Sequence, residues 1–405
     1  MTKLEELIQE LCPDGVEYKP LGDIATISRG GSFQKKDYTE NGVPCIHYGQ
    51  IYMYYGLFAE KTLTYISEEV AQKQKFAEPG DIIMAVTSEN MDDVCKCMAW
   101  LGSKKIAVSG HTAIIHHSIN PKYLVYWLSS IMFYQQKVKI AHGTKVIEVA
   151  PARLADIILP VPPLPVQREI VRILDNFTEL TAELTAELTA RKQQYAYYRD
   201  KLLSTNNSSV PVVELRDIVK KSCSGATPAK GNAEYYENGT IPWIRTQDVR
   251  FNEITEVNSY ITEKAVSETA TKWIPENCVI VAISGATAGR CAINKIKATT
   301  NQHCLNLIID DSMALYRYVF HCLCSKYEEL ISRKQGARGD LNSSLILSLP
   351  ISIPSLEVQK RLVEVLDNFD AICTDLNIGL PAEIEARQKQ YEYYRDNLLT
   401  FTPAD

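Results

Sequence analysis

Apolar residues recur at three- and four-residue steps from about Val166 to Ser204, a stretch that contains neither proline nor glycine. This spacing predicts one helix with a single apolar stripe, roughly 55 to 60 Å long at 1.5 Å per residue. Inside it, the tetrapeptide Thr-Ala-Glu-Leu at 181–184 is repeated at 185–188. A helix of this length has to bury its stripe against another element of the protein.

The sequence contains a tandem repeat. Leu-Asp-Asn-Phe at 174–177 returns at 366–369, and Tyr-x-Tyr-Tyr-Arg-Asp-x-Leu-Leu at 195–203 returns at 391–399. The second helical stretch contains Gly379 and Pro381, and an internal proline predicts that it is broken into two pieces. Two related helices in one chain can pair with each other, although each could instead cover its own domain.

The segments outside these helices differ between the two copies and contain short β-branched runs such as 82–86 and 279–283, separated by turn clusters such as 28–32 and 230–232. We therefore expect an α+β protein in which two mixed α/β domains are separated by two long helices. The helices are expected to pair as an antiparallel coiled coil, in a pseudo-twofold tandem repeat. The predicted boundaries are 1–158 for the first domain, 159–204 for the central helical region, 205–349 for the second domain and 350–405 for the C-terminal helical region.

Composition narrows the function classes. No stretch reaches the roughly 18 to 20 apolar residues of a membrane span, and the N-terminus lacks the pattern of a signal peptide. We therefore expect a cytoplasmic protein that makes no membrane contact. The 11 cysteines have neither zinc-site nor disulfide-framework spacing, which favours reduced, buried thiols.

Known catalytic motifs are missing. The sequence has no phosphate-binding loop of the nucleotide-hydrolysing type, and Pro162-Pro163 lacks the flanking polar and aromatic residues that an amino-methyltransferase needs to hold a flipped base. Asp14, Glu17 and Lys19 contain the residue types of a metal-dependent nuclease, but a tight turn leaves little room to bring the two acids around one ion. We predict no catalytic residue and no metal site.

The net charge of −6 is unevenly distributed. Residues 24–163 and 205–355 together carry +3, so the excess acid lies outside the two variable domains. Basic residues gather there in loops with aromatic neighbours, a pattern typical of nucleic-acid contacts. The candidate DNA-binding residues are Arg29, Lys35, Lys36, Tyr38, Lys220, Lys221, Lys230, Arg245, Arg290, Lys295, Lys297 and Arg338.

The duplicated helical signatures resemble the two conserved regions of the specificity subunits of type I restriction-modification systems. Gly-Ala-Thr-Pro at 225–228, Ile-Pro-Trp-Ile at 241–244, Ser-Gly-Ala-Thr at 284–287 and Asn-Gln at 301–302 resemble landmarks of that family's target recognition domains. The first domain keeps these less clearly, with Gly-Gly-Ser-Phe at 30–33, Val-Pro-Cys-Ile at 43–46 and Ser-Gly-His at 109–111 in the corresponding places.

The resemblance implies a non-catalytic subunit that reads a two-part, asymmetric sequence in double-stranded DNA. It further implies assembly with two methyltransferase subunits and with restriction subunits that translocate DNA. S-adenosylmethionine, ATP and Mg²⁺ would belong to those partners, with no cofactor in this chain. The helix pair would act as a ruler between the half-sites.

The tyrosine-rich signatures have two possible roles, core packing of the helix pair or docking of partner subunits. At least one tyrosine in each has to be exposed, because three within four positions cannot share one stripe. The candidate partner-binding residues are Tyr195, Tyr197, Tyr198, Arg199, Tyr391, Tyr393, Tyr394 and Arg395. The alternative functions are a standalone metal-dependent nuclease and a coiled-coil adaptor that does not bind DNA.

Overall fold

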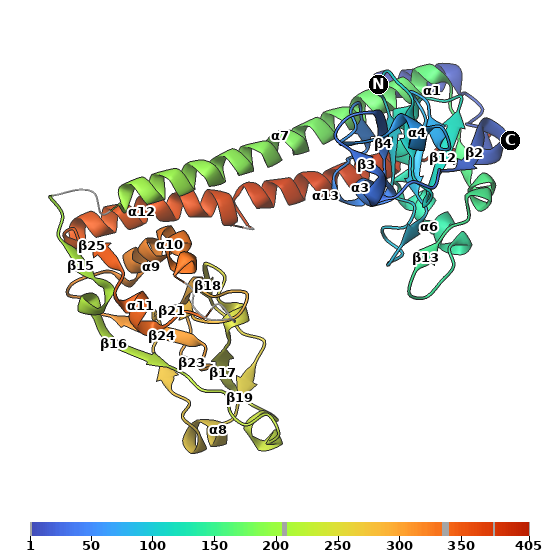
Figure 1. The fold of residues 1–405 in the computed structure, drawn as a ribbon. Helices are drawn as coiled ribbons and strands as arrows, with labels where there is room; N and C mark the ends of the chain where they lie inside the picture. Colours follow the sequence, from blue (N-terminus) through green and yellow to red (C-terminus); the bar gives the residue numbers. More distant parts are fainter. Residues whose placement is uncertain (1, 205–208, 334–339, 376, 405) are drawn as a thin grey trace. The chain divides into compact units, whose positions relative to one another are not determined.

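The computed structural model describes residues 2–204, 209–333, 340–375 and 377–404. The chain forms two units, one made of Met1–Thr185 and Ile384–Asp405 and the other of Ala186–Glu383 (Figure 1). The C-terminal segment thus returns to the first unit, where Val16 N donates to Thr402 O at 2.9 Å and Tyr18 OH donates to Phe401 O at 3.0 Å. The first helix, α1 (Lys3–Leu11), also belongs to this unit.

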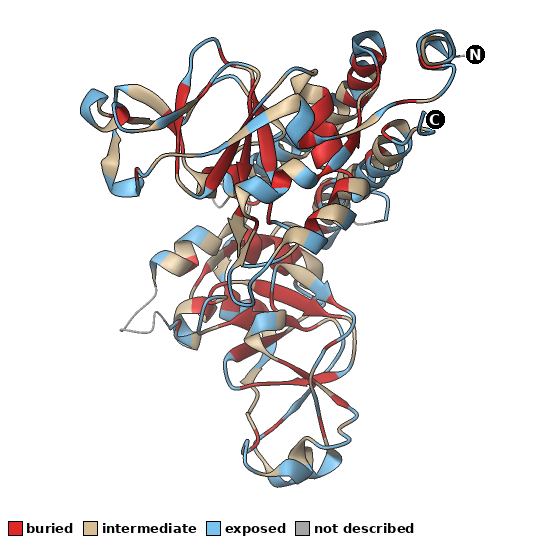
Figure 2. Cartoon of the chain, turned by 90° about the vertical axis from the view of Figure 1, so that its right-hand side faces the viewer, coloured by how far each residue is buried: buried red, intermediate tan, exposed pale blue. Residues whose placement is uncertain are grey.

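The first unit is built on two five-stranded sheets. The core sheet has, in order, β2 (Ala25–Arg29), β12 (Thr112–His117), β8 (Ile82–Ala85), β10 (Cys97–Trp100) and β5 (Phe58–Ala59). The second sheet has, in order, β3 (Tyr38–Thr39), β6 (Thr64–Ile66), β4 (Val43–Ile46), β11 (Ile106–Val108) and β7 (Lys75–Ala77). All four residues of the central strand β8 are buried because both of its faces are covered, as its continuous apolar sequence predicts. Figure 2 shows buried residues gathered on the interior strands and exposed residues on the outer loops and helices.

Short helices pack the first core. α5 (Pro121–Leu128) lies against β10 and contributes the fully buried Tyr123 and Trp127. It begins with an N-cap at Asn120, whose side chain accepts from Lys122 N and Tyr123 N. The next helix, α6 (Ile131–Ile140), packs beside α5.

The second unit repeats this construction, except that its second sheet has four strands instead of five. Its core sheet has, in order, β16 (Val219–Ser224), β24 (Cys304–Ile309), β21 (Val279–Ala282), β22 (Cys291–Asn294) and β18 (Asn252–Ile254). The smaller sheet has, in order, β19 (Tyr260–Ile261), β17 (Ile241–Ile244), β23 (Ala298–Thr300) and β20 (Trp273–Ile274). Even the turns before the central strands match, because Gly80 (φ +97°) and Asn277 (φ +61°) both adopt the left-handed conformation.

The remaining short strands and helices frame these sheets. The first unit also contains β1 (Tyr18–Pro20) paired with β14 (Ile158–Pro160), β9 (Thr87–Ser88) paired with β13 (Ile147–Glu148), α2 (Leu21–Ile24), α3 (Tyr48–Met53), α4 (Glu68–Ala71), η1 (Lys35–Asp37) and η2 (Pro151–Asp156). The second unit also contains β15 (Val212–Glu214) paired with β25 (Pro350–Ser352), α8 (Glu263–Glu268), α9 (Tyr316–Ser325), α10 (Tyr327–Ser332), α11 (Ser343–Leu347), η3 (Leu215–Ile218), η4 (Ala233–Tyr235) and η5 (Thr246–Asp248).

The predicted long helix is α7 (Leu164–Leu202), a single helix of 39 residues. The second helical stretch is broken into α12 (Leu356–Thr374) and α13 (Leu380–Leu398), with Pro381 in the first turn of α13, as the proline predicts. In the first unit Phe177 of α7 stacks on Tyr394 of α13, and in the second unit Tyr198 of α7 stacks on Phe369 of α12.

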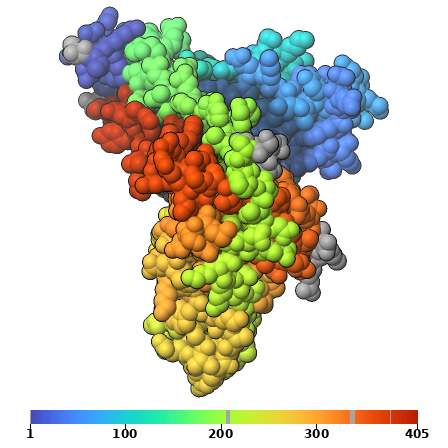
Figure 3. Space-filling view, turned by 90° about the vertical axis from the view of Figure 1, so that its left-hand side faces the viewer, coloured from blue at the N-terminus to red at the C-terminus, as the bar shows by residue number. Residues whose placement is uncertain are grey.

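Later residues of α7 therefore meet earlier residues of the C-terminal helices, and the predicted antiparallel pairing is confirmed. Figure 3 shows the C-terminal part of α7 beside α12 on the surface of the second unit. The expected fold class, two mixed α/β domains in tandem with long paired helices, is confirmed as well. The exact domain boundaries stay predictions. None of the described helices is long and apolar enough to cross a membrane.

Candidate nucleic-acid interface

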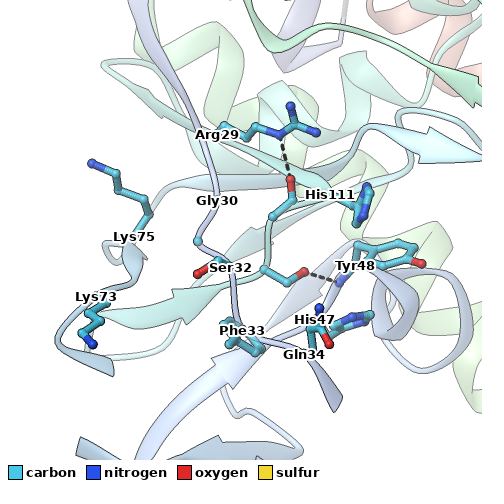
Figure 4. A pocket seen from close by; sticks show the side chains of 13 residues that line it. Arg29, Gly30, Ser32, Phe33, Gln34, His47, Tyr48, Lys73, Lys75 and His111 are labelled. Carbon is cyan, nitrogen blue, oxygen red and sulfur yellow. Dashed lines mark hydrogen bonds between the residues drawn. The ribbon is translucent and has the colours of Figure 1, made fainter. Parts of the chain in front are cut away.

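A cavity of about 590 Å³ opens in the first unit, where the loops after β2 and β4 meet the loop between β11 and β12 (Figure 4). Residues 29–34, 47–48 and 109–111 line it, together with Lys73 and Lys75. These stretches lie far apart in the sequence, and the shared β2-β12 and β4-β11 ladders bring their ends together.

Backbone hydrogen bonds fix the floor of this first pocket. Gly30 N donates to Thr112 O at 3.0 Å and Gly31 N donates to Val108 O at 2.6 Å. A Cβ atom added to Gly30 would lie 2.0 Å from Ser109 O, so only glycine allows the loop to pass this close to its neighbour. The loop is therefore held in one position at the mouth of the pocket.

Cations surround the first pocket. Arg29 donates from Nε to Gly110 O at 2.9 Å and forms an ion pair with Glu148 at 3.3 Å, which keeps its guanidinium at the rim. Lys73 and Lys75 lie across the pocket from His111 in Figure 4. His47 stands beside Tyr48 with ring centroids 4.5 Å apart. Burial, followed by the positive charge of Lys35 and the neighbouring His111, lowers the pKa of His47.

The second unit has a cavity of about 570 Å³ at the corresponding place. It is lined by the loop after β16, the start of the loop after β17, the segment 258–260 and the loop 301–303 between β23 and β24. Ala226 N donates to Thr300 O at 3.0 Å, as Gly31 N does to Val108 O in the first unit. A Cβ atom on Gly225 would lie 1.8 Å from Thr300 O, so this loop also requires glycine.

The two pockets share one electrostatic property. No aspartate or glutamate is among the residues that line either of them, although the whole chain has 49 acidic and 43 basic residues. The first is lined by Arg29, Lys73 and Lys75 with two histidines, and the second by Lys230 and Arg245 with one histidine. A cationic, concave surface without carboxylates attracts polyanions.

Three of the predicted DNA-binding residues line these pockets: Arg29, Lys230 and Arg245. Lys35 lies close enough to the first pocket to affect the charge of His47, and Lys36 follows it in η1. Tyr38 packs edge-on to His47 at 6.5 Å between ring centroids, and burial raises the pKa of its phenol to about 12.

The other predicted residues lie outside the pocket linings. Lys295 donates to Asn277 Oδ1 at 2.8 Å and lies 4.0 Å from Glu253, so local partners occupy its charge. Lys297 covers the Trp273 ring at 4.7 Å. Lys220 and Lys221 are exposed on β16, and Arg290 precedes β22 with its Nε buried. Arg338 lies outside the described residues.

Five residues that line the pockets are not among the DNA-binding residues predicted from the sequence: His47, Tyr48, Lys73, Lys75 and Gln302. A signal was available in the repeat itself, because His111 and His303 fall opposite each other in the two copies and both line a pocket. The residues that precede these histidines, Gly110 and Gln302, also correspond and also line the pockets.

The tyrosine signatures take equivalent positions on the two helices. Tyr195 is partly buried and its OH lies 3.4 Å from His321 Nδ1, while Tyr391 is 6% exposed and burial raises its pKa to about 12. Tyr197 and Tyr393 are 61% and 66% exposed. Tyr198 and Tyr394 lie between these extremes. The expectation that each signature exposes at least one tyrosine is confirmed.

The two arginines of the signatures are held in the same way. Arg199 pairs with Asp200 at 2.8 Å and covers the Tyr195 ring at 5.6 Å. Arg395 pairs with Asp396 at 2.8 Å and covers the Tyr391 ring at 5.5 Å. Each arginine therefore fixes the buried tyrosine of its own signature and leaves the exposed tyrosine free of this contact.

Nothing in the described residues supports the nuclease alternative. Glu17 pairs with Lys19 at 2.9 Å, and no group of three or more His, Cys, Asp or Glu side chains that could hold a metal ion occurs in the described part of the chain. The 11 cysteines are free thiols and nearly all are buried. Burial raises the pKa of Cys95 and of Cys304 to about 12, which keeps these thiols protonated and unreactive.

Comparisons with known proteins agree with this geometry. Residues 13–191 and 207–386 each match the sequence model of the type I restriction modification DNA specificity domain. The chain is 33% identical over 419 residues to a type I restriction enzyme specificity subunit from Escherichia coli, covering 99% of this chain and 97% of that one. It is 27% identical over 421 residues to a putative specificity subunit from Haemophilus influenzae, covering 99% of both.

Solved structures share the fold. A chain from a type I restriction-modification complex superposes with a TM-score of 0.68 at 15% identity, covering 96% of this chain and 98% of that one. The specificity subunit from M. genitalium gives a TM-score of 0.53 at 12% identity, covering 95% and 96% of the two chains. The HsdS subunit from Thermoanaerobacter tengcongensis gives 0.50 at 15% identity, covering 96% and 97%.

Proposed function

Because the chain belongs to the type I restriction-modification DNA specificity family, we propose that its two carboxylate-free pockets are the surfaces that read the two halves of a DNA target. The observation that carries the proposal is the recurrence of a cationic pocket at the same place in both copies of the fold. Lysine and arginine hold phosphates, while polar side chains at the pocket walls reach base edges in the major groove. The two pockets have different linings, which favours two different half-sites.

The long helices set the unread gap between the half-sites in this proposal. One extra Thr-Ala-Glu-Leu unit lengthens α7 by about 6 Å and adds a net rotation of about 40°. One base pair advances DNA by about 3.4 Å and, at about 10 to 10.5 base pairs a turn, rotates it by about 35°. The rotation matches one added base pair better than two, so helix length selects spacer length.

The exposed tyrosines are the proposed docking points for partner subunits. Tyr197 and Tyr393 occupy equivalent places and leave most of their ring area in solvent, which suits two copies of one partner. We assign these places to two methyltransferase subunits, with restriction subunits joining the assembly. Catalysis, S-adenosylmethionine, ATP and Mg²⁺ belong to those partners, and this chain supplies recognition and scaffolding in the cytoplasm.

Charge reversal inside and outside the pockets tests the DNA-reading proposal. Lys75→Glu and Lys230→Glu, made in the chain assembled with its methyltransferase subunits, should each weaken binding to the target duplex by at least tenfold. Arg153→Glu and Arg216→Glu are the matched controls, because these arginines are exposed, pair with Asp156 and Glu214, and lie outside both pockets. Equal losses in all four variants would show that overall charge, and not the pockets, governs binding.

A further inference from the structure

The two pockets can be compared position by position because their backbone hydrogen bonds match. Ser109 N donates to Ile46 O at 3.1 Å in the first unit, and Asn301 N donates to Ile244 O at 3.0 Å in the second. The residues that follow Ile46 and Ile244 are His47 and Arg245, which therefore occupy the same position in the two copies.

Local capping confirms this correspondence. His47 N donates to Gln50 Oε1 at 2.9 Å, and Arg245 N donates to Asp248 Oδ2 at 2.8 Å, each side chain reaching back from three residues further along the chain. Both residues stand at the end of the equivalent strands β4 and β17, and both line their pocket. Each residue also precedes a short helix, α3 after His47 and η5 after Arg245, so the two positions correspond while their side chains differ.

The environment of Arg245 leaves its guanidinium available to a ligand. Its guanidinium carbon lies 5.8 Å from the centroid of the Trp243 ring, which supports the flat group from one side. Its Nε is buried without a hydrogen-bond partner, and no carboxylate forms an ion pair with it among the described residues. Arg29 at the first pocket is, by contrast, already bonded to Gly110 O and Glu148. Arg245 therefore carries a donor, Nε, that has no acceptor among the residues the structure describes.

His47 presents a different donor at the same position. Its Nδ1 accepts from Gly49 N at 3.2 Å, so the neutral ring carries its proton on Nε2. Burial, Lys35 and His111 lower its pKa, and the ring stays neutral at physiological pH. The first pocket thus offers one neutral donor where the second offers the planar fork of an arginine.

A side chain that is alike in both pockets cannot account for a difference between the two half-sites. The loop glycines Gly30 and Gly225 and the histidines His111 and His303 are shared, whereas His47 and Arg245 differ in charge and in donor number. A guanidinium without a carboxylate partner, at the end of a strand, matches the adjacent O6 and N7 acceptors of guanine, which arginine binds with two parallel hydrogen bonds.

We propose that His47 and Arg245 occupy one base-reading position that is common to both domains, and that Arg245 selects a G·C pair in the half-site read by the second domain. This inference rests on the proposed function, because it takes the two pockets as the DNA-reading surfaces. In this proposal, the group that accepts hydrogen bonds from the Arg245 guanidinium is a guanine base and not a phosphate.

A reciprocal exchange tests the proposal. The methylated motif is determined by sequencing DNA from cells that express the methyltransferase subunit with the wild-type chain, with Arg245→His or with His47→Arg. Arg245→His should lose the preference for guanine at one position of the second half-site, where binding of single-substituted duplexes discriminates about 5- to 150-fold in the wild type. His47→Arg should gain a guanine at one position of the first half-site, and the spacer should stay the same in both variants.

Two outcomes would overturn the proposal. An unchanged motif with uniformly reduced methylation in Arg245→His and in Arg245→Lys would assign Arg245 to a phosphate. Loss of all methylation in both variants, at an unchanged melting temperature of the chain, would also contradict a role at a single base pair. If cells that lack this chain showed the same methylation, the proposed function itself would be wrong. That result differs from both outcomes above, so failure of the inference and failure of the proposed function are distinguishable.

Discussion

Phe177 stacks on Tyr394 with ring centroids 5.3 Å apart and 24° between the ring planes. The equivalent pair in the second unit, Tyr198 and Phe369, has centroids 6.3 Å apart at 26°. The same aromatic contact therefore joins α7 to its partner helix in both units, with the roles of the two helices exchanged. The exchange follows from the tandem repeat, because Phe177 corresponds to Phe369 and Tyr198 corresponds to Tyr394 in the two copies.

Replacing both exposed tyrosines should impair assembly and leave folding intact. Tyr197→Ala with Tyr393→Ala removes two rings that are mostly in solvent, so we expect a change in melting temperature of less than about 2 °C and clearly weaker capture of methyltransferase subunits. Size-exclusion chromatography of the mixed subunits measures the assembly. If the double variant had a much lower melting temperature but still bound methyltransferase subunits below that temperature, the two tyrosines would be core residues and not docking residues.

The buried tyrosines supply the contrasting variant. Tyr391→Ala removes a ring that packs in the first hydrophobic core, so it should destabilise the first unit by about 3 kcal/mol or more. Thermal unfolding of the purified full chain measures this loss. If Tyr391→Ala and the Tyr197 and Tyr393 double variant had equal effects on stability, the division into packing and docking positions would be wrong.

Lengthening the helix should change the spacer alone. One Thr-Ala-Glu-Leu unit inserted after Leu188 continues the existing repeat, and we expect a motif whose unread gap is one base pair longer with both half-sites unchanged. Because four residues exceed one helical turn of 3.6 residues, the inserted unit also rotates the apolar stripe slightly around the helix axis. An altered half-site sequence in the methylated motif would contradict the ruler.

Acid should weaken the contact between α12 and α9. Burial alone would raise the pKa of Asp367, but hydrogen bonds from His321 (2.7 Å) and Arg317 hold that pKa below its ordinary value. A carboxyl group whose pKa is depressed on folding stabilises the fold above its unfolded pKa of about 3.9, and that stabilisation is lost as the pH falls through the lower, folded-state pKa.

Asp367→Asn should therefore destabilise the second unit near pH 7 by about 1 to 3 kcal/mol, with a difference from wild type that shrinks towards pH 3. Thermal unfolding at a series of pH values measures the difference. A penalty that stays the same from pH 7 to pH 3 would show that the carboxylate charge does not contribute to this contact.

Two lysines outside the pocket linings provide a test of phosphate contacts. Lys105 covers the ring of Phe76 on β7 at 5.0 Å. Lys297 covers the ring of Trp273 on the equivalent strand β20 at 4.7 Å. If both hold phosphates, each alanine variant should weaken binding equally for all sequences. It should also lower the slope of log affinity against log salt by about one. If the slope did not change, the substituted lysine would not contact a phosphate.

Much of the fold follows from the periodicity and the repeat. The stripe between Val166 and Ser204 predicted α7 to within two residues, and Pro381 predicted the break between α12 and α13. The runs at 82–86 and 279–283 became the fully buried strands β8 and β21. These predictions hold because they depend on local spacing and on backbone chemistry, which a sequence displays directly.

The pockets could not be assembled from the sequence because their walls come from separate loops. His47, Lys75 and His111 meet only because β4, β11 and β7 pair in one sheet, and the register of that sheet is a tertiary property. Charge clusters were also ambiguous, since Lys295 looks like a DNA contact in sequence yet bonds to Asn277 and faces Glu253. Whether a basic residue is free depends on neighbours that the sequence does not place.

The most direct test of the central claim is the methylation pattern of total DNA from cells that express this chain with its methyltransferase subunit, compared with cells that lack the chain. We expect one motif made of two different half-sites with a fixed unread gap, present only when the chain is expressed. Methylation that does not depend on the chain, or that falls on a short continuous site, would contradict a protein that reads DNA through two separate pockets.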